Sequence, residues 1–251
     1  VRDILLDEAY RRENGRYGFY DKLTNATDEI QTQLGELNGI SYQNSISDLL
    51  AAINEVAKAP DDNTARAALV ESAISFLDRS QSIYKGLVSY QDSLNTEIAS
   101  ITNRINEIGE RIQYLNSQIS VIESGVETAM TLRDERDLLL DELSGYVKID
   151  YSEDANHVVT VMMEGNFFCD GLSVSHLGLN TIEGTSFYVP VWSEMKDTPL
   201  YNMELTMSTS NNTDIGSLKG LLAARGTISP TYANMTPPAQ VVTQKPDRAD
   251  Y

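Results

Sequence analysis

The chain has 251 residues, of which 19 are basic and 37 are acidic, so its formal net charge is −18 at pH 7. This excess of carboxylates repels nucleic acids and anionic membrane surfaces, and we expect neither as a partner. The single cysteine, Cys169, excludes an internal disulfide and any zinc site built from several cysteines. No run of about 18 apolar residues occurs, so a membrane-spanning helix is not predicted.

The first 145 residues have the pattern of helices. Apolar residues recur at helical spacing from residue 2 to about 35, with Gly15 and Gly18 as weak points. A second helix is expected from about Ser47 to Lys58, ended by Pro60. Asp61 or Asp62 can then cap a third helix that continues to about residue 124. With a rise of 1.5 Å per residue, that helix would be a rod on the order of 90 Å long.

The second half of this rod carries the clearest pattern in the sequence. Aliphatic residues alternate spacings of four and three, and almost everything between them is polar, which predicts coiled-coil-like packing. Isoleucine at both core positions favours three or more neighbouring helices over a two-stranded zipper. Counted backwards, the frame continues less strictly to Val70. We call the regular part the seam: Leu94, Ile98, Ile101, Ile105, Ile108, Ile112, Leu115, Ile119 and Ile122.

After Gly125 the pattern changes twice. A last long helix is expected from about Ala129 to Ser144, with Gly145 as a left-handed C-cap. Alternating strands and turns follow, and the segments SFYVPVW and MELTMS extend them to about residue 209. The segment GSLKGLLAAR then predicts a short helix, and prolines mark an extended tail.

These elements predict a mainly α fold: an elongated antiparallel helical bundle with one very long coiled-coil-like helix and an appended β-rich module, α+β overall. The expected organisation is a helical bundle at 1–145, a β-rich module at 146–210, a helix returning to the bundle at 214–226 and a tail at 227–251.

The acidic stretch LRDERDLLLDELS at 132–144 allows two interpretations. On a helix, Asp134, Asp137 and Asp141 form a row that could in principle bind a divalent metal, although such ions want more ligands from more than one element. Arg133 and Asp137, four residues apart, instead suit a charged packing surface. We predict packing, no metal and no cofactor.

Other reactive residues have ordinary explanations. His157 and His176 are expected in turns or at the surface of the β-region, and Cys169 as a small buried side chain in a strand. Three aromatic residues, Tyr188, Trp192 and Tyr201, could form the core of the β-module or a surface patch. The sequence contains no His-Glu-x-x-His, no Gly-x-Ser-x-Gly and no phosphate-binding loop, so an enzyme is not predicted.

Several segments, taken in order, resemble the flagellar hook-associated protein 1 family, whose members are hook–filament junction proteins. Pro60 and Arg66 match a helix start of that family, and GSLKGLLAAR matches its return helix. By this resemblance, we expect the family's terminal assembly segments to be missing at both ends of this sequence. The most specific match lies in the acidic stretch, at Leu132, Asp134, Arg136, Asp137, Leu139, Leu140, Glu142, Leu143 and Ser144.

The resemblance implies a structural component of the bacterial flagellum that joins hook to filament and catalyses no reaction. Its implied partners are identical subunits in a helical tier, the hook protein, the second hook–filament junction protein and an export chaperone. Export without a cleaved signal peptide to the extracellular flagellum is implied too, and the first ten residues lack the features of such a peptide. Within the family, Arg136 and Asp137 would tie their helix to a neighbour. An alternative function is an extracellular adhesin or host-binding module carried on a helical stalk.

Overall fold

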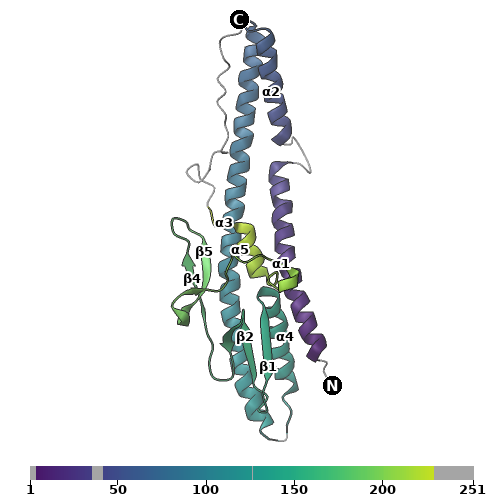
Figure 1. Cartoon of the computed structure of the whole chain (residues 1–251), viewed down its shortest axis with the longest axis vertical. Helices are drawn as coiled ribbons and strands as arrows, with labels where there is room; N and C mark the ends of the chain where they lie inside the picture. The colour runs from purple at the N-terminus through teal and green to yellow at the C-terminus, as the bar shows by residue number, and fades with distance from the viewer. Residues whose placement is uncertain (1–3, 36–41, 126, 229–251) are drawn as a thin grey trace.

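A computed structural model describes residues 4–35, 42–125 and 127–228. The expected tail lies outside these residues from 229 onward. Helix α3 (Asn63–Glu123) forms the long axis of an elongated molecule, and the other elements pack along it (Figure 1). Its N-cap is Asp62, whose side chain accepts a hydrogen bond from the backbone N–H of Thr64. The predicted mainly α fold, with one very long helix and small sheets beside it, is confirmed.

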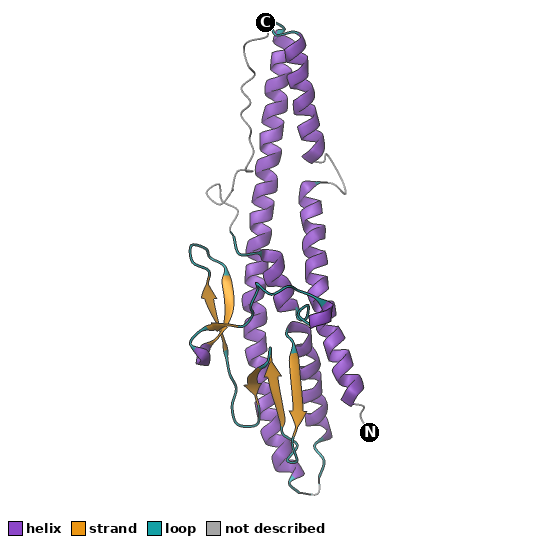
Figure 2. Ribbon diagram, viewed as in Figure 1, coloured by secondary structure: helices purple, strands orange, loops and turns teal. Residues whose placement is uncertain are grey.

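Helices α1 (Ile4–Leu34) and α2 (Tyr42–Lys58) follow each other along one side of α3 (Figure 2). Helix α2 begins earlier than predicted, at Tyr42, because the Tyr42 ring stacks on Phe76 of α3 with centroids 5.7 Å apart. Further down, α1 packs against α4 (Met130–Tyr146) and α5 (Ser217–Arg225), and both of these contact α3.

The prediction of a C-cap at Gly145 is wrong. Helix α4 continues to Tyr146, and the extended residue Val147 follows it. The cause is tertiary packing: a side chain added at Gly18 of α1 would lie 2.7 Å from the carbonyl oxygen of Gly145. Gly18 therefore marks a close approach between α1 and α4 rather than a weak point of α1.

Two small antiparallel sheets lie beside the lower half of α3 (Figure 2). The first has the order β1 (Ile149–Glu153), β2 (Val159–Met163), β3 (Asn166–Cys169). The second has the order β4 (Leu177–Thr181), β5 (Tyr188–Trp192), β6 (Thr198–Pro199).

The predicted strand at MELTMS, residues 203–208, is wrong. Helix η1 (Ser193–Met195) leads into β6, and the chain then forms turns up to helix η2 (Thr209–Asn211). Strand β5 already pairs with β4 on one edge and β6 on the other, so it offers this segment no free edge.

The main core lies where α3, α4, α5 and both sheets meet. Of the nine seam residues, the eight from Leu94 to Ile119 are buried, and Ile122 packs partly buried on a small second cluster. Cys169 is buried in β3, as predicted. The three aromatic residues belong to the core and do not form a surface patch. Trp192 and Tyr201 are buried, and Tyr188 packs half-buried beside them.

Candidate functional site: two arginine–asparagine clasps on the long helix

Three asparagines of α3 attach the strands to the helix. Each side-chain amide donates one hydrogen bond to a strand region and accepts another, so that it substitutes for a neighbouring strand. Asn95 bonds the backbone of Ser186 and Tyr188 at 2.9 and 2.7 Å. Asn106 bonds Leu177 in both directions, at 2.9 and 2.8 Å, and Asn116 does the same to Val159 at 2.8 and 3.1 Å.

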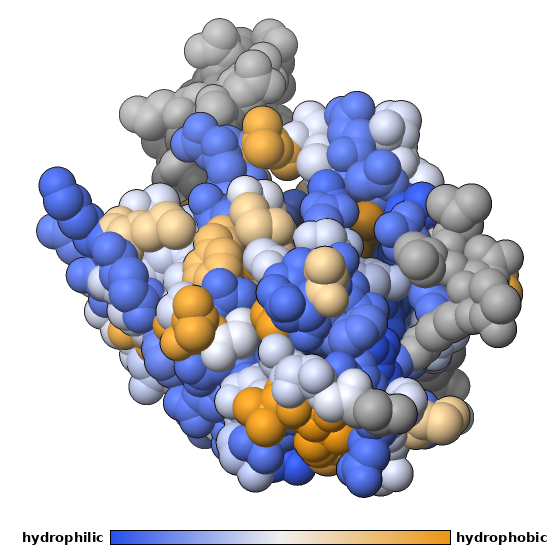
Figure 3. Space-filling view, turned by 90° about the horizontal axis from the view of Figure 1, so that it is seen from below, coloured by the Kyte–Doolittle hydropathy of each residue, from blue (hydrophilic) through white to orange (hydrophobic). Residues whose placement is uncertain are grey.

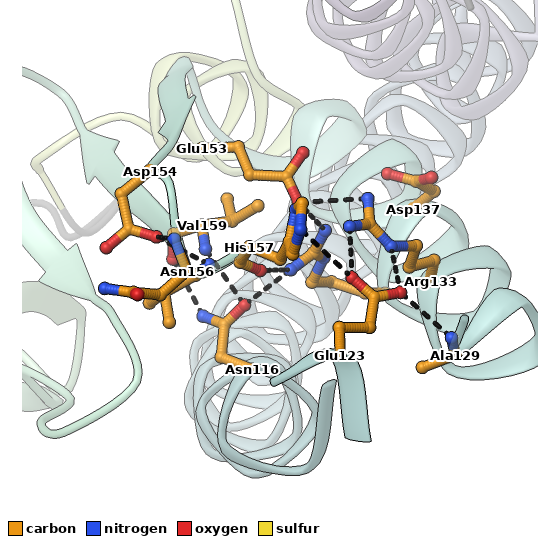
Figure 4. A network of polar contacts seen from close by, with 12 residues as sticks. Asn116, Glu123, Ala129, Arg133, Asp137, Glu153, Asp154, Asn156, His157 and Val159 are labelled. Carbon is orange, nitrogen blue, oxygen red and sulfur yellow. Dashed lines mark hydrogen bonds and ion pairs between the residues drawn. The ribbon is translucent and has the colours of Figure 1, made fainter. Parts of the chain in front are cut away.

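A buried arginine completes the contact at Asn116, and we call Asn116, Arg136, His157 and Val159 together the lower clasp. Figure 4 labels Asn116, His157 and Val159 of this group. Arg136 of α4 is 2% exposed, and its Nη1 donates to Oδ1 of Asn116 and to the carbonyl oxygen of His157, each at 2.8 Å. Its Nη2 donates to Glu153 at 3.1 Å. Burial lowers the pKa of Arg136 below its usual value. One guanidinium therefore joins α4, α3 and the β1–β2 hairpin.

The upper clasp repeats this arrangement about six helical turns up the rod. Arg225 of α5 is 3% exposed, and its Nη1 donates to Oδ1 of Asn95 at 2.7 Å and to the carbonyl oxygen of Tyr188 at 2.6 Å. The guanidinium also lies 4.9 Å from the centre of the Phe187 ring. Burial lowers the pKa of Arg225 to about 10.

Around the lower clasp, Glu123 and Arg133 close the lower end of the rod. Arg133 Nε donates to Glu123 at 2.8 Å, and the backbone N–H of Ala129 donates to the same carboxylate at 2.9 Å (Figure 4). The hydrogen bond from Arg133 is the main reason that the pKa of Glu123 falls to about 2. The predicted pairing of Arg133 with Asp137 is not the one formed, because Arg133 reaches Glu123 and Glu153 instead.

Two of the three aspartates in the acidic row of α4, Asp137 and Asp141, are engaged in packing. Arg11 of α1, 4% exposed, donates from Nε to Asp141 at 2.7 Å and lies 3.7 Å from Asp137. Asp134 is exposed to solvent. Over residues 4–35, 42–125 and 127–228, no group of three or more His, Cys, Asp or Glu side chains is placed to hold a metal ion.

The remaining residues of the family motif either pack in the core or form polar contacts with α3 and α1. Leu140 and Leu143 are buried in the main core, and Leu132 and Leu139 are partly buried. Glu142 accepts two hydrogen bonds from Arg104 of α3, at 2.8 and 3.0 Å, and these lower its pKa. Ser144 accepts a hydrogen bond of 3.1 Å from Asn14 of α1.

Both histidines lie near the surface, as predicted. His157 has a left-handed backbone, with φ of 63°, in the turn between β1 and β2, and its ring is 44% exposed. The His176 ring is 43% exposed, and its Nε2 lies 3.1 Å from Glu110. Seen from below, the molecule is mostly hydrophilic, with apolar side chains in small groups (Figure 3). No helix in the described ranges is long and apolar enough to cross a membrane.

Sequence reasoning missed the three asparagines and the role of Arg225. A signal existed, because each asparagine directly follows a seam residue: Leu94, Ile105 and Leu115. Asparagine is also unfavourable inside helices, since its side chain competes for backbone hydrogen bonds. A regular row of asparagines beside an apolar seam therefore indicates that the row binds backbone groups of another element.

Comparisons with known proteins agree with this architecture. The model of the family described as flagellar hook-associated protein FlgK helical domain matches residues 27–246. Flagellar hook-associated protein 1 of Bacillus subtilis (strain 168) is 24% identical over 192 residues, which cover 75% of this chain and 38% of that protein.

Among solved structures, the flagellar hook junction protein FlgK from Burkholderia pseudomallei matches with a TM-score of 0.51 and 17% identity. That match covers 88% of this chain and 38% of the solved chain, so this chain spans well under half the length of either relative. Because the family match extends over most of its residues, the chain belongs to the family of the flagellar hook-associated protein FlgK helical domain.

Proposed function

We propose that this chain is the helical core of a hook–filament junction protein, a structural adaptor of the bacterial flagellum that catalyses no reaction. The observation that carries the proposal is the family match over residues 27–246. The names of the two relatives, hook-associated protein and hook junction protein, support the adaptor rather than the adhesin.

The geometry suits a mechanical part. A single helix of 61 residues carries load along its axis, and its lower half is packed on α4, α5 and both sheets. The two clasps hold the strands to this rod through hydrogen bonds to backbone groups and buried guanidinium groups. Shear between the rod and the sheets would have to break these directional bonds, which stiffens the lower half.

The proposed partners follow from this function. Identical subunits would form a helical tier, in contact with the hook protein on one side and the second junction protein on the other, because repeated contacts between identical surfaces generate helical assemblies. An export chaperone would accompany the full-length chain before secretion. The proposed location is the extracellular flagellum, reached without a cleaved signal peptide.

Complementation tests the proposal. Full-length protein carrying this segment is expressed in flagellated cells that lack their own junction protein, and filament growth is scored by electron microscopy. We expect the wild-type protein and the surface variant Arg111→Ala to restore filaments, and Arg136→Ala to restore fewer. Secretion is measured in parallel to separate export from assembly. Secreted, folded wild-type protein that leaves the hooks without filaments would contradict the proposal.

A further inference from the structure

Of the three asparagines that attach strands to α3, the middle one is not joined by an arginine. Asn95 and Asn116 share their Oδ1 atoms with the buried arginines of the upper and lower clasps. Asn106 bonds Leu177 in both directions, and no arginine or lysine side chain in the described part of the chain donates to it. The attachment of β4 to α3 therefore lacks the permanent cation that each clasp has.

A histidine lies at this middle attachment. His176 directly precedes Leu177, the first residue of β4, and β4 lies beside α3 (Figure 1). Glu110 follows Asn106 by four residues, so the two side chains lie on the same face of α3. The His176 Nε2 atom lies 3.1 Å from a carboxylate oxygen of Glu110. Asn106 and Glu110 thus contact two consecutive residues at the start of the strand.

A second carboxylate faces the other ring nitrogen. Glu194 of η1 accepts the backbone N–H of His176, which lies 3.1 Å from each of its carboxylate oxygens. The same carboxylate lies 3.6 Å from His176 Nδ1. Each ring nitrogen therefore faces a different carboxylate, one from α3 and one from the connection between β5 and β6. We call His176, Glu110 and Glu194 together the histidine bridge.

The protonation state of the ring decides how well it fits between these carboxylates. A carboxylate only accepts hydrogen bonds, whereas a neutral imidazole has one N–H group and one lone pair. Neutral His176 can donate to Glu110 or to Glu194, and its other nitrogen then places a lone pair against a negative charge. The imidazolium has two N–H groups and a positive charge, so both contacts become attractive. The complete bridge therefore requires the cation.

Other charged groups near the bridge do not neutralise its carboxylates. The charged neighbours of Glu110 on α3 form ion pairs outside the bridge, and these pairs are Arg104–Glu107 at 3.0 Å and Arg111–Glu135 at 2.7 Å. Lys196 and Asp197, which follow η1, are exposed and have opposite charges. Among the described residues, no lysine or arginine forms an ion pair with Glu110 or Glu194, and His176 is their partner. The two negative charges therefore act on the histidine ring.

The second histidine of the chain provides a comparison. His157 also lies between two carboxylates, with ring nitrogens 3.6 Å from Glu123 and 3.7 Å from Glu153. Those two carboxylates already pair with two arginines of α4, whose positive charges repel a protonated ring. We therefore expect protonation to strengthen the contacts of His176 much more than those of His157.

We propose that the histidine bridge is a pH-sensitive latch, which tightens the attachment of the β4–β5–β6 sheet to α3 as the pH falls from about 7.5 to about 5.5. Histidine ordinarily changes its charge in this range, whereas glutamate stays ionised. Because the folded chain favours the charged ring, the bridge stabilises the attachment at the lower pH and loses this effect as the pH rises. The His176 side chain is 43% exposed, so it exchanges protons directly with the medium.

Hydrogen exchange measured by mass spectrometry on residues 1–251 tests the proposal. Protection factors, which correct for the effect of pH on intrinsic exchange, are determined for β4 at pH 7.5 and pH 5.5 and are expressed relative to those of β2, which the bridge does not contact. In the wild-type protein, the relative protection of β4 should be about threefold to fivefold higher at pH 5.5, as expected for partly exposed ion pairs.

Three variants locate the effect. His176→Gln should abolish the difference between the two pH values, Glu110→Gln should reduce it, and the control His157→Gln should retain it. Circular dichroism verifies that each variant keeps its helices. Equal relative protection of wild-type β4 at both pH values would overturn the proposal. A difference that survives in His176→Gln, or one that His157→Gln also abolishes, would overturn it as well. The readout is independent of flagellar function.

Discussion

Asn116 and Arg136, on two different helices, share a hydrogen bond of 2.8 Å between Oδ1 and Nη1, and both side chains are almost completely buried. The same guanidinium bonds the carbonyl oxygen of His157, and the same amide bonds Val159 in both directions. This pair is therefore the junction at which α3, α4 and the β1–β2 hairpin are held together.

Removing the guanidinium should loosen that junction. Arg136→Ala is expected to lower the free energy of unfolding by about 2–4 kcal/mol, since it deletes charge-assisted hydrogen bonds and removes the donor from the part-buried carbonyl oxygen of His157. The control is Arg111→Ala, because Arg111 and its partner Glu135 are 45% and 39% exposed, and such pairs contribute at most about 1 kcal/mol. Urea unfolding followed by circular dichroism measures the unfolding free energy of both variants. If Arg136→Ala and Arg111→Ala lower it equally, Arg136 does not hold this junction together.

The seam predicts a difference between two isoleucines of one helix. Ile108 is fully buried, whereas Ile74 is 55% exposed. In residues 1–251, Ile108→Ala should cost about 2–5 kcal/mol of unfolding free energy, through lost burial and the cavity it leaves. Ile74→Ala should change it by less than about 0.5 kcal/mol. A similar effect of the two substitutions would mean that the lower seam is not the core of the rod.

Two glycines should respond to alanine in opposite directions. A Cβ at Gly18 would meet the carbonyl oxygen of Gly145 at 2.7 Å, so Gly18→Ala should be destabilising although alanine is the better helix former. At Gly86 of α3 the Cβ would meet the flexible end of Gln33, which can move. Gly86→Ala should therefore be neutral or stabilising by up to about 1 kcal/mol. Thermal unfolding of both variants provides the check, and a stabilised Gly18→Ala would refute the close contact between α1 and α4.

Acid should weaken the lower end of the rod through Glu123. Its pKa is about 2 in the folded chain, against a usual value of 4.5, chiefly because Arg133 donates hydrogen bonds to the carboxylate. A carboxyl with a lowered pKa contributes stability above its unfolded value and loses it as the pH falls toward the folded value. The stability of wild-type protein should thus decline more between about pH 4.5 and pH 2 than that of Glu123→Gln. If stability falls equally with pH in the two proteins, the Glu123 carboxylate does not form the described hydrogen bonds with Arg133.

Much of the helical architecture could be predicted, because its signals are local. The cap at Asp62 and the seam follow from spacing within one segment, and in the structure Asp62 is the N-cap and eight of the nine seam residues are buried. The clasps could not be predicted in the same way. Arg225 and Asn95 are 130 residues apart, and only the fold brings them to 2.7 Å.

The two incorrect predictions, for Gly145 and for residues 203–208, failed because contacts between separate parts of the chain are not visible in a local pattern. Gly145 has the residue type of a helix end, yet the close approach of α1 decides its conformation. Residues 203–208 alternate like a strand, yet both edges of β5 are already paired. In each case a contact from a distant part of the chain overrides a local preference.

The central claim is that α3 forms a continuous stiff shaft, and small-angle X-ray scattering of residues 1–251 tests it most directly. A straight helix of 61 residues is about 90 Å long and by itself has a radius of gyration of about 26 Å. A compact domain of 251 residues would have a radius of about 18 Å. We predict a radius of gyration of at least about 26 Å and a maximum dimension above about 90 Å for the monomer. A radius near that of the compact domain would contradict the account.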